Sequence, residues 1–198
     1  MLSFWWIRHA PVVGNNFCCY GNNEVDCDVS NVQLFQELKD KLPNNSHVYT
    51  SNLSRTIKTF KAVANLGYKY ESHRIDNRLS EQDLGDYTGM KYNDLYKLTK
   101  KLGVYDRNWL MKADYSPPNG ESFNNLCQRV KSFINETILN HKDGNVIIFS
   151  HGGPIRAAIS LAINYKLNYV LPIEIDNNKL TIINYYGKGN YKVLKANS

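Results

Sequence analysis

Short apolar runs alternate with segments of helical apolar spacing along most of this 198-residue chain. The runs at 2–7, 47–50 and 146–149 are short and rich in β-forming residues, which is typical of strands that are buried on both faces. Ser30 and Gln33 form a capping-box signature ahead of the first helical segment. The helical spacing predicts helices over 34–42, 53–67, 93–102, 123–138 and 155–163.

The alternation of strands and helices predicts an α/β fold. A further strand is expected near 68–75, and the runs at 180–186 and 191–194 predict a terminal hairpin because a glycine-rich turn separates them. We therefore expect a three-layer αβα sandwich around a mostly parallel central sheet. The chain length suits one domain spanning residues 1–198.

Composition narrows the partners that this domain is expected to have. The net charge is +6, but the basic residues are scattered and their longest run is Lys100–Lys101, which argues against nucleic acid. The four cysteines contain no CxxC pair, which is typical of reduced thiols in the cytoplasm. No segment has the apolar length of a secretion signal or a membrane span. We expect a cytoplasmic monomer or homodimer without a membrane partner.

Polar residues follow three of the predicted strands at the point where each strand ends. Arg8 and His9 follow the first strand, Arg55 lies a turn beyond the second, and His151 with Gly152–Gly153 follows the third. Ligands of open α/β sheets bind beyond the carboxyl ends of the strands. If these strands are parallel neighbours, two arginines and two histidines converge on one edge of the sheet.

The chemistry of this predicted convergence suits a phosphate dianion. Arginine presents a planar fork of donors that matches phosphate oxygens. Gly152 and Gly153 open a predicted helix, where free backbone N–H groups are expected to face the same anion. Each residue alone also has a structural explanation: Arg8 could pair with a buried carboxylate, and Arg55 could be an exposed helix residue. His47, His73 and His141 are assigned no role.

Five segments of the chain carry recognisable motifs: Ile7-Arg8-His9, residues 51–56 with Thr59, residues 79–89, residues 119–122 with Arg129, and residues 148–153. In this order they resemble the motifs of the histidine phosphatase superfamily, which has the phosphoglycerate mutase-like fold. Within that superfamily the short chain resembles the α-ribazole phosphatases. An Arg-His pair alone would be a weak match, whereas five segments in order are specific.

The resemblance implies that His9 is the nucleophile, which forms a phosphohistidine, and that Glu81 is the proton donor. On residue type alone, Glu81, Asp83 and Asp86 cannot be separated, and the resemblance selects the first. Physical chemistry adds that a hydrogen bond on one ring nitrogen would fix the tautomer of His9. Nearby arginines would also lower its pKa. The phosphate ligands implied are Arg8, Asn15, Arg55, His151 and Gly152, with no metal and no cofactor.

Three features of the sequence bear on specificity. The run Ala10-Pro11-Val12 departs from the Gly and the Thr or Ser that most members carry after the nucleophile. Residues 86–120 are rich in Tyr and are expected to form a segment that covers the substrate; an alternative is that half of these rings only cover the core. The pair Glu121–Ser122 reads as a helix start capped by Ser122, or else as a substrate contact.

The function that the resemblance implies is hydrolysis of a phosphomonoester on a small phosphorylated metabolite, of which α-ribazole 5′-phosphate is one. A cofactor-dependent phosphoglycerate mutase is the nearest alternative, and a non-catalytic scaffold that binds phosphorylated ligands is a second. Mutases of the family carry extra arginines in the covering segment. Arg107 is the only arginine between Glu81 and Arg129, which favours the phosphatase.

Overall fold

A six-stranded sheet forms the centre of the protein. The computed structural model describes residues 1–14, 17–107 and 109–198. Within these ranges the strand order is β3-β2-β4-β1-β5-β6. Strands β1 to β4 pair in parallel, whereas β5 pairs antiparallel with both β1 and β6. The strands are β1 (Leu2–Arg8), β2 (Ser46–Thr50), β3 (Tyr70–Ile75), β4 (Gly144–Ser150), β5 (Leu180–Tyr185) and β6 (Tyr191–Lys195).

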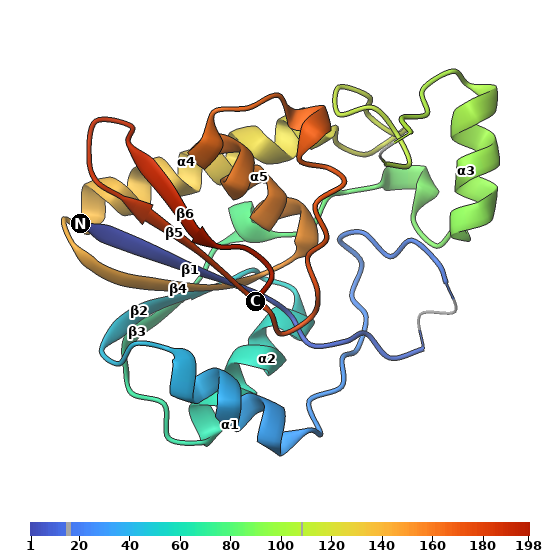
Figure 1. The fold of residues 1–198 in the computed structure, drawn as a ribbon. Helices are drawn as coiled ribbons and strands as arrows, with labels where there is room; N and C mark the ends of the chain where they lie inside the picture. The colour runs from blue at the N-terminus through green and yellow to red at the C-terminus, as the bar shows by residue number, and fades with distance from the viewer. Residues whose placement is uncertain (15–16, 108) are drawn as a thin grey trace.

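Helices cover both faces of this sheet, as Figure 1 shows. Helices α1 (Val32–Lys41) and α2 (Ser54–Asn65) lie on one face, and α4 (Phe123–Asn140) and α5 (Gly152–Ile163) lie on the other. Helix α3 (Tyr92–Lys101) stands apart from these layers (Figure 1). The predicted three-layer αβα sandwich with a mostly parallel sheet is confirmed.

Successive side chains of β1 contribute to the hydrophobic cores on both faces. Phe4 and Trp6 pack in the cluster beneath α4 and α5, whereas Trp5 and Ile7 pack with α1 and α2. Side chains of a strand point alternately to the two faces, so a strand covered on both sides must be apolar at consecutive positions. This is why the first apolar run of the sequence shows no alternation.

One predicted helix start is wrong by a residue, and another is confirmed. The N-cap of α1 is Asn31, whose side chain accepts a hydrogen bond from the N–H of Leu34 at 3.1 Å. Ser30 lies outside the helix, and its hydroxyl donates to Asp28 at 2.6 Å. Ser122 caps α4 as expected, because its hydroxyl accepts from the N–H of Asn125 at 3.1 Å.

Cys19, Cys27 and Cys127 are free thiols. Cys19, Cys27 and Cys127 are buried, and burial raises the pKa of Cys19 and of Cys127 to about 12. At neutral pH these two side chains are therefore protonated and behave as small apolar groups. Among the described residues, no helix is both long enough and apolar enough to cross a membrane.

Truncation of Leu126 should destabilise the protein far more than the same truncation of Leu139. Both leucines lie on α4, but Leu126 is fully buried in the core whereas Leu139 is 81% exposed. We expect Leu126→Ala to cost about 2–5 kcal/mol of unfolding free energy and Leu139→Ala less than about 0.5 kcal/mol. Urea denaturation followed by circular dichroism measures both. Equal losses would contradict the packing of α4 described above.

Candidate active site

Three buried side chains meet where β1, β4 and α2 come together. His9 follows β1, His151 follows β4, and Arg55 lies in the first turn of α2. The ring centroids of the two histidines are 5.0 Å apart, and Nε of Arg55 donates to Nδ1 of His151 at 3.2 Å. None of the three is exposed to solvent. The parallel strand topology thus brings these residues together, as their places in the sequence predicted.

The ring of His9 presents an unprotonated nitrogen. Its Nδ1 donates to the carbonyl of Ala10 at 2.7 Å, because a carbonyl can only accept. The other nitrogen, Nε2, is buried without a hydrogen-bond partner in the described part of the chain. The pKa of His9 falls to about 3, first because of burial and next because of the positive charge of Arg55. The expected direction is therefore right, but burial outweighs the arginines.

His151 is a neutral ring with both nitrogens engaged. Nδ1 accepts from Arg55, so Nε2 carries the proton and donates to the hydroxyl of Ser51 at 2.8 Å. Burial, and after it the charge on His9 when protonated, lowers the pKa of His151 well below its ordinary value. For His151 to donate to a phosphate oxygen, as the sequence resemblance implies, its bond to Ser51 has to be exchanged.

Both arginines of the predicted phosphate site are held by backbone carbonyls. Arg55 is fully buried, which excludes an exposed helix position, and its two Nη atoms donate to the carbonyls of Asn23 and Gly21 at 2.7 and 2.8 Å. Arg8 donates through Nη1 to the carbonyl of Ile175 at 2.5 Å. Among the described residues, neither arginine forms an ion pair with a carboxylate, and this favours an incoming anion.

Tyr20 lies between these two arginines. Its hydroxyl accepts from Nη2 of Arg8 at 3.4 Å, and its ring centroid is 5.2 Å from the guanidinium carbon of Arg55. The ring also approaches His9 edge-on, at 6.4 Å between centroids. The phenol therefore covers the side of the site on which Arg8 and Arg55 converge.

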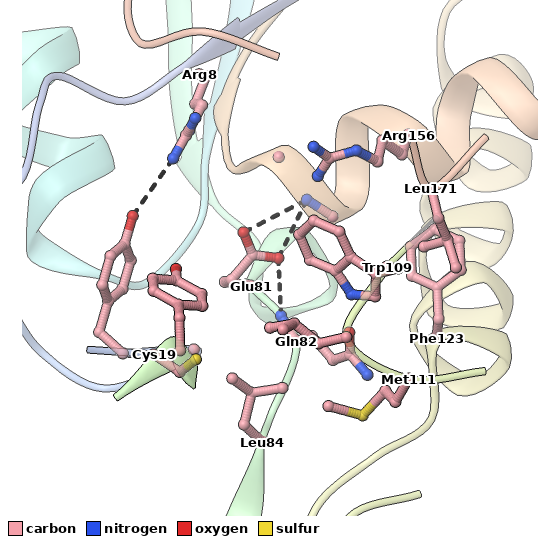
Figure 2. A pocket seen from close by; sticks show the side chains of 16 residues that line it. Arg8, Cys19, Glu81, Gln82, Leu84, Trp109, Met111, Phe123, Arg156 and Leu171 are labelled. Carbon is pink, nitrogen blue, oxygen red and sulfur yellow. Dashed lines mark hydrogen bonds between the residues drawn. The ribbon is translucent and has the colours of Figure 1, made fainter. Parts of the chain in front are cut away.

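The carboxylate of Glu81 occupies the start of α5. Its Oε1 accepts from the N–H of Gly153 at 3.1 Å and from the N–H of Gln82 at 2.9 Å (Figure 2). The sequence predicted that these glycine N–H groups would be open to an anionic ligand, and for Gly153 this prediction is wrong. A Cβ atom at residue 153 would lie 2.3 Å from Oε1, so glycine is required for this approach.

A second arginine network fixes the backbone that carries Glu81. Arg129 donates through Nη1 to the carbonyls of Arg78 and Ser80, at 2.8 and 2.7 Å, and through Nη2 to the carbonyl of Glu81 at 3.1 Å. The same guanidinium pairs with Glu121 at 2.5 Å. Glu121 thus serves to hold Arg129 in place.

A cavity of about 160 Å³ opens beside Glu81 (Figure 2). Among its described lining residues, Glu81 is the only acidic one, and Arg8 and Arg156 are basic. Neither Asp83 nor Asp86 reaches the cavity. The rest of its wall is largely aromatic and aliphatic: Tyr20, Leu84, Tyr92, Trp109, Leu110, Met111, Phe123 and Leu171.

The Tyr-rich segment contributes only part of its rings to this cavity. Tyr92 and Trp109 line it. The hydroxyls of Tyr87 and Tyr115 bond to one another at 2.7 Å in a small core beside α3. Two further rings of this segment, Tyr96 and Tyr105, pack edge to face against one another. The interpretation that half of these rings cover the core agrees with this arrangement.

Comparison with known proteins assigns the family. The model of the histidine phosphatase superfamily (branch 1) matches residues 4–198. The chain belongs to this superfamily. A phosphoserine phosphatase 2 candidate from Hydrogenobacter thermophilus is 29% identical over 197 residues, covering 95% of this chain and 92% of that protein. The α-ribazole phosphatase from Shigella flexneri has the same fold, with a TM-score of 0.80 and 23% identity over 99% of this chain and 96% of its own.

Other relatives of this histidine phosphatase chain are longer. A bifunctional protein from Mycobacterium tuberculosis is 27% identical over 123 residues, which are 62% of this chain and 33% of that protein. The chain thus covers about a third of the length of the first curated relatives that it matches.

The structure adds two residues to the candidate site, Tyr20 and Arg156, that the sequence pattern did not indicate. Tyr20 belongs to a loop without periodic spacing, so no pattern points to it. Arg156 lies four residues after Gly152 on α5, and residues four apart share one face of a helix. The four-residue spacing from Gly152 could therefore have identified Arg156 as a candidate site residue from the sequence. Asn15, expected as a phosphate ligand, lies outside the described residues.

The buried histidines of the protein should make its stability fall as the pH falls. Below pH 6.5 the unfolded chain takes up a proton on His9, whereas the folded protein does not until about pH 3. The unfolding free energy should therefore decrease by about 1.4 kcal/mol for each pH unit and each such histidine. His9→Gln should show a shallower slope between about pH 6 and pH 4.5 in urea titrations. Parallel curves for the two proteins would contradict the buried, neutral state of His9.

Proposed function

We propose that the protein is a phosphomonoester hydrolase that acts through a phosphohistidine on His9. The observation that carries the proposal is the Nε2 atom of His9, which is buried and unprotonated near two arginines that form no ion pair with a described carboxylate. A neutral imidazole is a competent nucleophile toward phosphorus, and a covalent intermediate divides one difficult displacement into two easier ones. The family match and the phosphatase relatives support this assignment.

In the first proposed step, Nε2 of His9 attacks phosphorus and the bond from phosphorus to the ester oxygen breaks. Glu81, at the N-terminus of α5, donates a proton to the departing oxygen, so that an alcohol leaves. Arg8 and Arg55 balance the charge of the phosphoryl oxygens. Phosphoryl transfer depends mainly on such positioning and charge neutralisation.

In the second proposed step, water attacks the phosphorus of the phosphohistidine. The carboxylate of Glu81, left ionised by the first step, takes a proton from that water as the bond between phosphorus and nitrogen breaks. Inorganic phosphate forms and His9 regains its free Nε2. His151 and the N–H of Gly152 are proposed as further donors to the phosphoryl oxygens.

The proposed substrates are small phosphorylated metabolites whose leaving group fits the cavity beside Glu81. Residues 86–120 are proposed to cover the bound substrate, since Tyr92 and Trp109 of this segment already line the cavity. The relatives suggest two test compounds, α-ribazole 5′-phosphate and O-phosphoserine. We place the protein in the cytoplasm, where thiols such as those of Cys19, Cys27 and Cys127 remain reduced.

Rapid quench with phosphorus-labelled substrate tests this function. A labelled protein that is stable in base and labile in acid, formed at the rate of turnover, is the expected result. Release of phosphate without any such species would contradict the proposal. So would efficient interconversion of 2- and 3-phosphoglycerate with little free phosphate, because a mutase returns the phosphoryl group to its substrate.

A further inference from the structure

Arg156 points into the cavity with its end nitrogens available. Its Nε donates to the carbonyl of Ile173 at 2.7 Å, and its guanidinium carbon lies 4.9 Å from the ring centroid of Trp109. These two contacts fix the plane of the guanidinium. Among the described residues, the side chain of Arg156 makes one hydrogen bond, through Nε. Both of its Nη atoms face the cavity (Figure 2).

The absence of a side chain at Gly152 keeps Arg156 uncovered beside Glu81. A Cβ atom at residue 152 would lie 2.9 Å from Nη1 of Arg156 and 3.9 Å from Oε2 of Glu81. The backbone of Gly152 is in ordinary helical conformation, so its glycine is not required by a positive φ. Glycine therefore avoids a close contact with Nη1 and leaves this nitrogen open toward the cavity, next to the proton donor.

In the proposed first step, Arg156 has no ionised carboxylate beside it among the described residues that line the cavity. Glu81 is then the protonated acid, and it is the only acidic residue among them. Glu174, which does not line the cavity, also acts on the charge of Arg156. Burial lowers the pKa of Arg156, which reflects the cost of keeping this charge away from water. Pairing reduces that cost, and a carboxylate on the leaving group would supply a partner inside the cavity.

From this juxtaposition we propose that Arg156 binds a carboxylate on the leaving group, so that the preferred substrates are small phosphate esters of hydroxy acids. The inference rests on the proposed function and extends it to a substrate class. Two parallel N–H donors match the two oxygens of a carboxylate. The cavity of about 160 Å³ is small beside the 300–1,000 Å³ of sites for drug-sized ligands, which suits a compact leaving group. A neutral, ring-bearing alcohol such as α-ribazole would leave Arg156 unpaired.

Two pairs of esters that differ by one carboxylate test the assignment. They are O-phosphoserine with O-phosphoethanolamine, and 4-carboxyphenyl phosphate with phenyl phosphate. The wild-type protein should prefer the carboxylated ester of each pair in kcat/KM. Arg156→Gln should reduce that preference by about 10- to 100-fold, the range of a charge-assisted hydrogen bond. Arg156→Lys, which keeps the charge but loses the fork, should retain part of it. Arg107→Gln, an exposed change in the same segment as Trp109, should leave it unchanged.

The outcomes separate this inference from the function on which it rests. An unchanged preference in Arg156→Gln, with kcat reduced equally for all four esters, would overturn it and make Arg156 a residue that positions Glu81. Binding of the aryl pair to His9→Ala, measured by calorimetry, needs no turnover. If His9→Ala binds the carboxylated ester more tightly than phenyl phosphate, and His9→Ala/Arg156→Gln does not, the subsite is upheld even if the wild-type protein hydrolyses none of the esters. Equal binding of the two esters to His9→Ala would refute it.

Discussion

Replacing His9 by alanine should lower kcat by a factor on the order of 10⁴ to 10⁶, the range found when the nucleophile or its base is removed from a covalent catalyst. It should also abolish the phosphoenzyme. The reason is that Nε2 of His9 is the only atom proposed to bond to phosphorus. It is kept unprotonated by the hydrogen bond of Nδ1 to Ala10 and by a pKa of about 3.

A matched control for this variant is His47→Ala. His47 pairs with Val146 near the beginning of β4, whereas the site lies beyond the end of β4 at His151. We expect the control to keep its activity and its labelling by substrate. A phosphoenzyme that still forms in His9→Ala would show that another group accepts the phosphoryl group, and peptide mapping of the label would then locate it.

The sequence predicted the site wherever strand topology alone decides the position of a residue. His9 and His151 follow β1 and β4, which pair in parallel with Arg8 opposite Ser150. Consecutive apolar residues identify both strands as central, and the ends of central parallel strands must meet. For this reason local pattern was enough to bring the two histidines and Arg55 together.

Contacts between distant loops could not be predicted in the same way. The carboxylate of Glu81 accepts from the N–H of Gly153, which is 72 positions away in the sequence. The backbone position of Glu81 depends on Arg129, which donates to the carbonyls of residues 78, 80 and 81. Tyr20 reaches Arg8 and Arg55 from a loop without regular spacing. Such contacts depend on side-chain packing in three dimensions, which periodicity does not encode.

The predicted α1 cap shows the same limit at a smaller scale. Ser30 and Asn31 are adjacent and both are good N-cap residues. In the structure Ser30 bonds to Asp28 and Asn31 caps the helix. The capping signature alone does not decide between two adjacent cap residues, because the choice depends on where the backbone turns into the helix.

Replacing Glu81 by glutamine should separate esters by the basicity of their leaving groups. For an alkyl phosphate the departing alkoxide needs a proton, so kcat should fall by about 10² to 10⁴. For 4-nitrophenyl phosphate the leaving nitrophenolate is stable without a proton, so the first step should be largely spared. The second step still lacks a base. Stopped-flow absorbance should therefore show a burst of nitrophenolate equal to the enzyme concentration, followed by slow turnover.

The structure makes this substitution a clean one. The amide oxygen of glutamine can still accept from the N–H of Gly153, so the start of α5 keeps its contact. Asp86→Asn is the matched control, because Asp86 is exposed and bonds to Asn119 outside the cavity. Its kinetics should equal those of the wild-type protein. Equal losses for both classes of ester in Glu81→Gln, without a burst, would mean that Glu81 holds the start of α5 rather than moving protons.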